Sequence, residues 1–199
     1  MLVVPKKNSK GIILMIISMA SFAVGDTFVK ISGAFLSPAQ IMFFLIAGGL
    51  IIFAMIAKFK GENLLDSRAF SPVLLIRYLA EMIGLVAMIM GLTKIPLSVV
   101  GTVTQASPIL VAAGAIFFFK EIVSWRRWSS IVMGFIGVVL VIQPGSQNLD
   151  YAVIWAVVAL VAFSIRDLVT RLTPPDIPSS SIATFTMIAA FPFTTAWVF

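Results

Sequence analysis

Three carboxylates lie inside long apolar runs of this sequence, at Asp26, Glu81 and Asp167. A charged side chain at membrane depth usually faces protein or a watery cavity, where it can bind a substrate, a cation or a proton. Each carboxylate has a basic residue four positions away on the same helical face, so the alternative is a self-neutralised ion pair or an interfacial anchor. The basic residues at this spacing are Lys30, Arg77 and Arg171, and Arg166 directly precedes Asp167.

A neutral polar patch lies in the middle of the fourth apolar run, residues 97–119. Thr102, Gln105 and Pro108 fall on one face of a helix, and Ser107 adds a hydroxyl beside them. Proline has no backbone N–H, so Pro108 leaves one carbonyl of the preceding turn without its amide partner. We expect this patch to form a wall of a substrate cavity, with a kink that serves only packing as the alternative.

Histidine and cysteine are both absent from the 199 residues. Ser-His and Cys-His nucleophile systems, thiolate metal sites and His-ligated or Cys-ligated haem are therefore excluded. The carboxylates are scattered one to a run, and no glycine-rich phosphate loop is present. We predict no catalytic residues, no metal site and no cofactor, so a membrane-embedded enzyme is the weakest hypothesis.

The composition predicts an integral membrane protein. Hydrophobic residues make up 60% of the chain and charged residues only 11%, against roughly 45–50% and 25% in soluble domains. Long apolar runs must satisfy their backbone groups internally in a bilayer, so each run should be a helix. We predict an all-α bundle of about seven spans, at residues 11–32, 39–57, 72–92, 97–119, 128–142, 151–172 and 181–199.

Basic residues indicate the orientation and explain the formal charge of +6. They concentrate in alternate connectors, which by the positive-inside rule are cytoplasmic. Residues 1–10 should then form a cytoplasmic N-terminal arm, and the positive charge does not call for a nucleic-acid partner. The clusters are Lys6, Lys7 and Lys10; Lys58, Lys60 and Arg68; and Lys120, Arg126 and Arg127.

An internal repeat relates the first run to the sixth. When the sequence is aligned with itself so that Asp26 matches Asp167, Phe22 matches Phe163 and Lys30 matches Arg171. Five runs, an odd number, occupy one repeat unit, so the second unit would enter the membrane from the opposite side. We predict a first unit at 11–143 and the start of an inverted second unit at 151–199, the arrangement of many secondary transporters.

Motifs from the third run onward resemble the EamA domain of the drug/metabolite transporter superfamily. They are Gly91–Leu97, Ala106–Leu110, Phe119–Glu121, Trp128 and Gly134–Leu140. The resemblance implies ten helices in two inverted five-helix units, a central cavity and alternating-access transport of small organic metabolites. Since the last three helices of this pattern are missing and the sequence stops inside the seventh run, we expect a C-terminal truncation.

The leading hypothesis is a secondary active transporter, or permease, in a bacterial-type inner membrane. Its cavity would be lined by the first, third, fourth and sixth runs, and Glu81 or Asp26 would carry a coupling proton. Its partners would be the lipid bilayer, a small metabolite, and either a protein supplying further helices or a second copy of the chain. The alternative is a non-transporting subunit or remnant that only packs with partner helices. The sequence does not name the substrate.

Overall fold

The computed structural model describes residues 9–61, 70–120, 124–142, 151–174 and 177–198. These residues form helices and short turns and contain no strand, as the composition predicts. Lys6, Lys7, Arg68, Glu121 and the connector 143–150 lie outside the described residues. The helices are α1 (Ser9–Ser32), α2 (Pro38–Phe59), α3 (Pro72–Lys94), α4 (Leu97–Thr104), α5 (Ser107–Phe119), α6 (Trp125–Ile142), α7 (Val153–Thr170) and α8 (Ser179–Val198).

Among the described residues, six segments are long and apolar enough to cross a membrane, and a further apolar stretch within α6 is shorter. The fourth long segment, Leu97–Phe119, contains both α4 and α5. The chain is therefore a multi-span helical membrane bundle. The run expected at 128–142 lies entirely within α6, and its stretch Trp128–Gly137 is an apolar helix shorter than a full span.

Serine–proline pairs set where α2 and α3 begin. Ser37 caps α2 by accepting a hydrogen bond from the backbone N–H of Gln40, whose side chain in turn accepts from the N–H of Ser37. Ser71 accepts from the N–H of Leu74 in the same way at the start of α3. A proline at the first helical position loses no bond, because that N–H has no intrahelical acceptor.

The fourth span is broken between α4 and α5. Its backbone turns at Gln105 and Ala106, and Pro108 is the second residue of α5. The missing N–H of Pro108 and the steric clash of its ring with the preceding turn account for this interruption. The break that the sequence places at Pro108 is thus present. The span ends at Lys120, whose backbone is left-handed with φ 52°.

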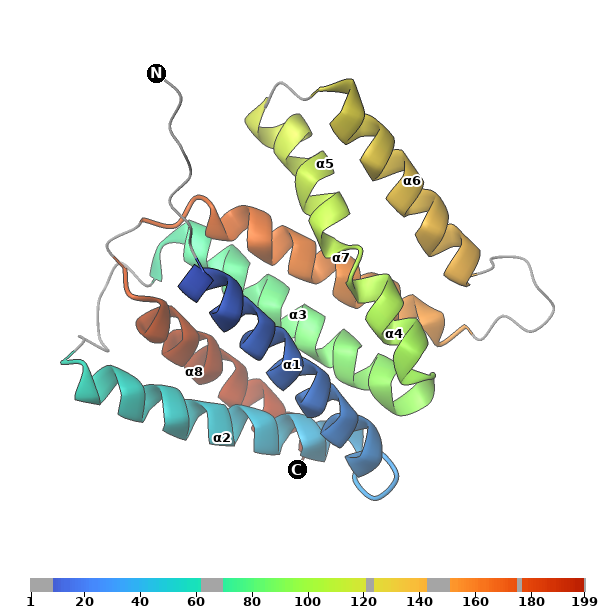
Figure 1. Ribbon diagram of the computed structural model, residues 1–199. Helices are drawn as coiled ribbons and strands as arrows, with labels where there is room; N and C mark the ends of the chain where they lie inside the picture. The colour runs from blue at the N-terminus through green and yellow to red at the C-terminus, as the bar shows by residue number, and fades with distance from the viewer. Residues whose placement is uncertain (1–8, 62–69, 121–123, 143–150, 175–176, 199) are drawn as a thin grey trace.

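The bundle is built around two helix pairs, α3 with α7 and α2 with α8, and both α4 and α5 also pack on α7. Figure 1 shows that α1 and α7 run in opposite directions, and so do α2 and α8. The buried core includes Met42, Ile46, Leu92, Val100 and Val103. The outer faces remain apolar, as helices in contact with lipid require.

Gly84 allows α3 and α7 to approach closely. A Cβ added at Gly84 would lie 2.5 Å from Cε1 of Phe163 on α7, well inside van der Waals contact. The ring of Phe163 in turn lies beneath the guanidinium of Arg166, with Cζ 4.7 Å from the ring centroid. The small residue at position 84 therefore fixes how near the charged side chains of α7 come to α3.

Candidate functional site

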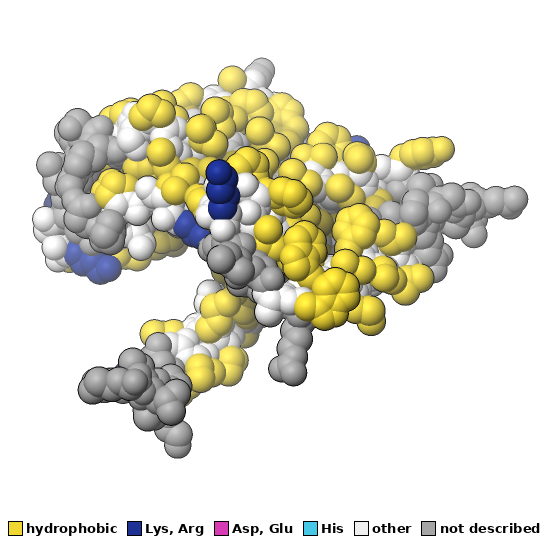
Figure 2. All heavy atoms as spheres, turned by 90° about the horizontal axis from the view of Figure 1, so that it is seen from above, with side chains coloured by type: hydrophobic (Ala, Val, Ile, Leu, Met, Phe, Trp, Pro, Cys, Tyr) yellow, Lys and Arg dark blue, Asp and Glu magenta, His cyan; other side chains and the backbone are white. Residues whose placement is uncertain are grey.

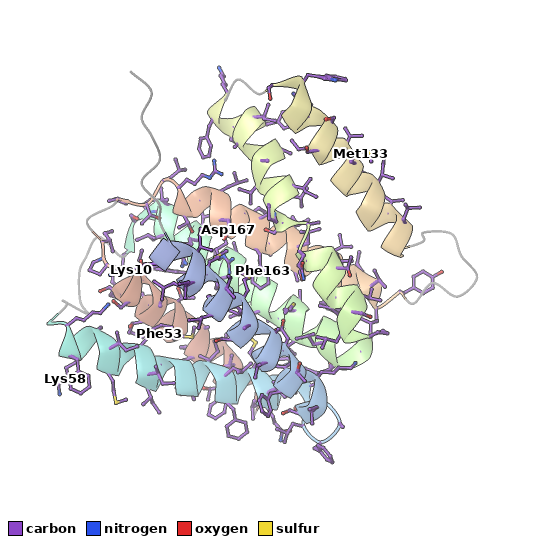
Figure 3. The ribbon with its side chains drawn as sticks, viewed as in Figure 1. Lys10, Phe53, Lys58, Met133, Phe163 and Asp167 are labelled. Carbon is purple, nitrogen blue, oxygen red and sulfur yellow. The ribbon has the colours of Figure 1, made fainter. Side chains whose placement is uncertain are left out.

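A charged cluster of Arg77, Glu81, Arg166 and Asp167 joins α3 to α7. Arg166 Nη1 lies 3.0 Å from Glu81 Oε1, and Arg166 Nη2 lies 2.8 Å from Asp167 Oδ1. Arg77 Nη2 is 4.0 Å from Glu81 Oε2, at the i,i+4 spacing expected from the sequence. Figure 3 shows Phe163 and Asp167 on α7 where that helix passes α3. The cluster thus combines one expected pair with a connection between helices.

Arg77 extends the cluster to a third helix. Its Nε donates to Thr170 Oγ1 on α7 over 3.0 Å, and its Nη1 donates to Thr186 Oγ1 on α8 over 3.2 Å. Sequence reasoning missed both threonines, because their 93- and 109-residue separations from Arg77 leave no local signal. Arg77 therefore binds across the bundle rather than only anchoring α3 at an interface.

The charges of the cluster cancel, with two guanidinium groups facing two carboxylates. The side chain of Glu81 is 15% exposed and that of Arg166 is 26% exposed, whereas Asp167 is 42% exposed. Partial burial strengthens these interactions relative to a surface pair. The arrangement can hold α3, α7 and α8 together, and Asp167 is the member most open to a further ligand.

Asp26 and Lys30 do not form the ion pair that their spacing allows. Lys30 Nζ instead donates to the backbone carbonyl of Ile95 over 2.8 Å, which ties the end of α1 to the turn between α3 and α4. Among the described residues, Asp26 has no hydrogen-bond or ion-pair partner. The self-neutralised alternative for Asp26 is therefore wrong in this structure.

Asp26 lines a pocket of about 460 Å³ between α1, α2, α3 and α8, called the Asp26 pocket below. Helix α1 lies in front of the other helices in Figure 1, and Figure 2 shows it standing out from the body with a hollow beside it. The pocket wall differs from the expected cavity, because α2 and α8 contribute where the fourth and sixth runs had been predicted. Its lining includes Phe22, Met42, Phe53 and Met187.

The polar patch of the fourth span lies elsewhere. Thr102, Gln105 and Pro108 are exposed and line none of the described pockets, and the Thr102 hydroxyl donates to the carbonyl of Ser98 over 2.7 Å. Ser107 does contact another helix, with its Oγ 3.1 Å from Ser164 Oγ on α7. The structure therefore brings Ser107 to α7 and leaves the other three on an open face.

The remaining predicted residue, Arg171, caps the C-terminal end of α7 and is exposed. Among the described residues, no three His, Cys, Asp or Glu side chains gather where they could hold a metal ion. The described sites thus offer charge pairing and hydrophobic enclosure.

The sequence matches the EamA-like transporter family over residues 9–143, more than half of the chain. The chain belongs to the EamA-like transporter family. This membership confirms the resemblance that the motifs of the third to fifth runs indicated. It also makes the chain a multi-pass integral membrane protein of a transporter family.

Curated relatives carry transporter names. The chain is 27% identical to the S-adenosylmethionine uptake transporter of Rickettsia prowazekii (strain Madrid E), over 83% of this chain and 56% of the relative. It is 26% identical to the pseudopaline exporter CntI of Pseudomonas aeruginosa (strain UCBPP-PA14), over 90% and 64% of the two chains. It is 27% identical to the riboflavin transporter of Rhizobium johnstonii, over 49% and 32%.

The chain spans about half the length of the first of these relatives. No solved structure matches it. The bacterial sources of the relatives are consistent with the inner membrane as its location.

Proposed function

We propose that this protein is a secondary transporter that moves a small organic metabolite across the bacterial inner membrane by alternating access. The observation that carries the proposal is the Asp26 pocket, because its walls come from both predicted repeat units: α1, α2 and α3 from the first and α8 from the second. A site between two repeats is where secondary transporters bind their substrates. Family membership and the transporter names of the relatives support the same class of function.

The opposite directions of α1 and α7, and of α2 and α8, support the inverted arrangement. Movement of one unit against the other would then change which side of the membrane reaches the pocket. The charged cluster joins α3 to α7 and α8, so it lies across the boundary that must move. We assign it the role of a closure that stabilises one of the two alternating states.

Proton coupling is the finer part of the proposal and rests on Asp26 or Glu81. Glu81 faces Arg166 and Arg77, whereas Asp26 has no cationic partner among the described residues. A carboxylate without a cationic partner is available to bind a proton or a positively charged group of a ligand. Asp26 is therefore the stronger of the two coupling candidates.

The test is uptake by proteoliposomes containing the chain, with a panel of labelled cationic, zwitterionic, neutral and anionic metabolites. Saturable flux of at least one of them supports the transporter. If protons are co-transported, uptake falls as external pH rises, and Asp26→Asn or Glu81→Gln abolishes that dependence. Folded protein that moves no member of the panel would overturn the proposal in favour of a non-transporting subunit. Flux that is independent of pH in the native chain and in both variants would reject proton coupling and leave the transport proposal standing.

A further inference from the structure

We propose that the Asp26 pocket selects monovalent organic cations with an apolar or aromatic body and excludes organic anions. This inference rests on the proposed transport function and names the substrate class of the same site. Its basis is a carboxylate that has no cationic partner among the described residues and that lies in an otherwise mostly apolar lining.

The first step is the charge of the pocket. Asp26 is the only charged side chain among the described residues that line it. The nearest basic residue on the same helical face, Lys30, donates to Ile95 instead. A partly buried carboxylate that lacks a cation favours a positive ligand group and repels a negative one.

The second step is the remaining lining. Phe22 and Phe53 supply aromatic rings whose faces attract cations, and Met42 and Met187 supply polarizable thioethers that adapt to ligand shape. Among the hydroxyls of the lining, that of Ser21 donates to the carbonyl of Ile17 over 2.9 Å. Its hydrogen is therefore already engaged and is not free to bind an anion.

The third step is size. About 460 Å³ lies within the usual range of small-molecule sites and exceeds what a bare metal ion or ammonium ion would fill. Gly25 precedes Asp26 in the pocket wall, and a Cβ added there would meet nothing within 4 Å. The space beside the carboxylate is thus open to an organic group attached to the cation.

The charged cluster does not compete for this role. Its two arginines and two carboxylates neutralise one another, and none of the four lines the Asp26 pocket. Binding of an organic cation should therefore depend on Asp26 and be insensitive to carboxylates elsewhere in the chain.

The experiment is equilibrium dialysis of the full chain in dodecyl maltoside micelles with two soluble aromatic probes of opposite charge, benzyltrimethylammonium and benzenesulfonate. We expect saturable binding of benzyltrimethylammonium alone. Asp26→Asn should weaken it about 10- to 100-fold, the usual loss for a charge-assisted contact. The matched control Asp176→Asn removes one carboxylate from the segment between α7 and α8 and should leave binding unchanged.

A second variant keeps the carboxylate and fills the space. Gly25→Leu should fold, because a side chain at this position meets open space, and it should weaken binding about tenfold by occluding the pocket. Preferential binding of benzenesulfonate, or cation binding that survives both Asp26→Asn and Gly25→Leu, would overturn the inference. Transport of anions in liposomes without cation binding would refute the cation site and leave the transporter intact. Cation binding without any flux would support the cation site and overturn the proposed transport function.

Discussion

Arg166 on α7 and Glu81 on α3 approach to 3.0 Å although 85 positions separate them in the chain. The pair links the first predicted repeat unit to the second, and Asp167 holds the same guanidinium from its other edge over 2.8 Å. Glu81 thus interacts with a cation of a different helix at a shorter distance than with Arg77 of its own helix. The predicted i,i+4 pair of α3, Arg77 with Glu81, is therefore joined to Arg166 and Asp167 of α7 in one cluster, and the ion pairs of that cluster described above do not include Arg171.

The pair should be energetically coupled. Glu81→Gln and Arg166→Gln should each lower the free energy of unfolding in micelles by about 1–2 kcal/mol, because each deprives a partly buried charge of one of its two partners in the cluster. The double variant should lose less than the sum of the two, with a coupling of about 1 kcal/mol. Lys58→Gln, at the exposed end of α2 (Figure 3), is the control and should change little. Strictly additive losses would show that the pair contributes no interaction energy.

The α3–α7 contact should not tolerate a larger residue at Gly84. Gly84→Ala should destabilise the bundle by about 1–3 kcal/mol, because the new Cβ would displace the Phe163 ring and with it Arg166. Thermal unfolding of the detergent-solubilised protein measures the effect. Phe163→Leu, introduced together with Gly84→Ala, should recover part of the lost stability, because the smaller side chain makes room for the new Cβ.

Gly137 provides the comparison for that experiment. A Cβ at Gly137 on α6 meets nothing within 4 Å, so Gly137→Ala should be neutral or slightly stabilising. Equal losses at both glycines would mean that helix propensity or expression, rather than the Phe163 contact, governs the result.

Lys30 should restrain the end of α1. Lys30→Met removes the hydrogen bond to the carbonyl of Ile95, so backbone amides in residues 29–36 should exchange hydrogen for deuterium about fivefold faster. Mass spectrometry of peptides from this segment gives the readout. Lys30→Arg retains a donor and should stay close to the native rate, whereas an unchanged rate in Lys30→Met would show that the bond does not hold the helix end.

Pro108 should be the cause of the break in the fourth span. Pro108→Ala restores a backbone N–H, so α4 and α5 should straighten towards one helix. The absence of cysteine lets spin labels be placed at Ser98→Cys and Phe117→Cys without other changes. Electron spin resonance should show a longer separation, approaching about 28 Å between the two backbones for a continuous helix. Gly101→Ala serves as control and should leave the distance unchanged.

The helices could be predicted because their cause is local. Apolar runs, the Ser-Pro starts at Ser37 and Ser71 and the break at Pro108 all follow from properties of neighbouring residues. The candidate site was predicted only in part. Glu81, Arg77, Arg166 and Asp167 meet as one cluster, but Thr102, Gln105 and Pro108 lie on an open face rather than at the Asp26 pocket.

The sequence by itself determined that the chain crosses the membrane as helices, because a bilayer offers no other partner for the backbone. It also determined which charges lie within those helices. Tertiary structure alone decided which group each charged side chain contacts. Lys30 donates to a backbone carbonyl, Arg166 pairs with Glu81, and Asp26 faces a cavity. Residue spacing reveals neighbours on one helix, whereas contacts between helices depend on how far apart the backbones pack, and a single side chain such as Phe163 against Gly84 sets that distance.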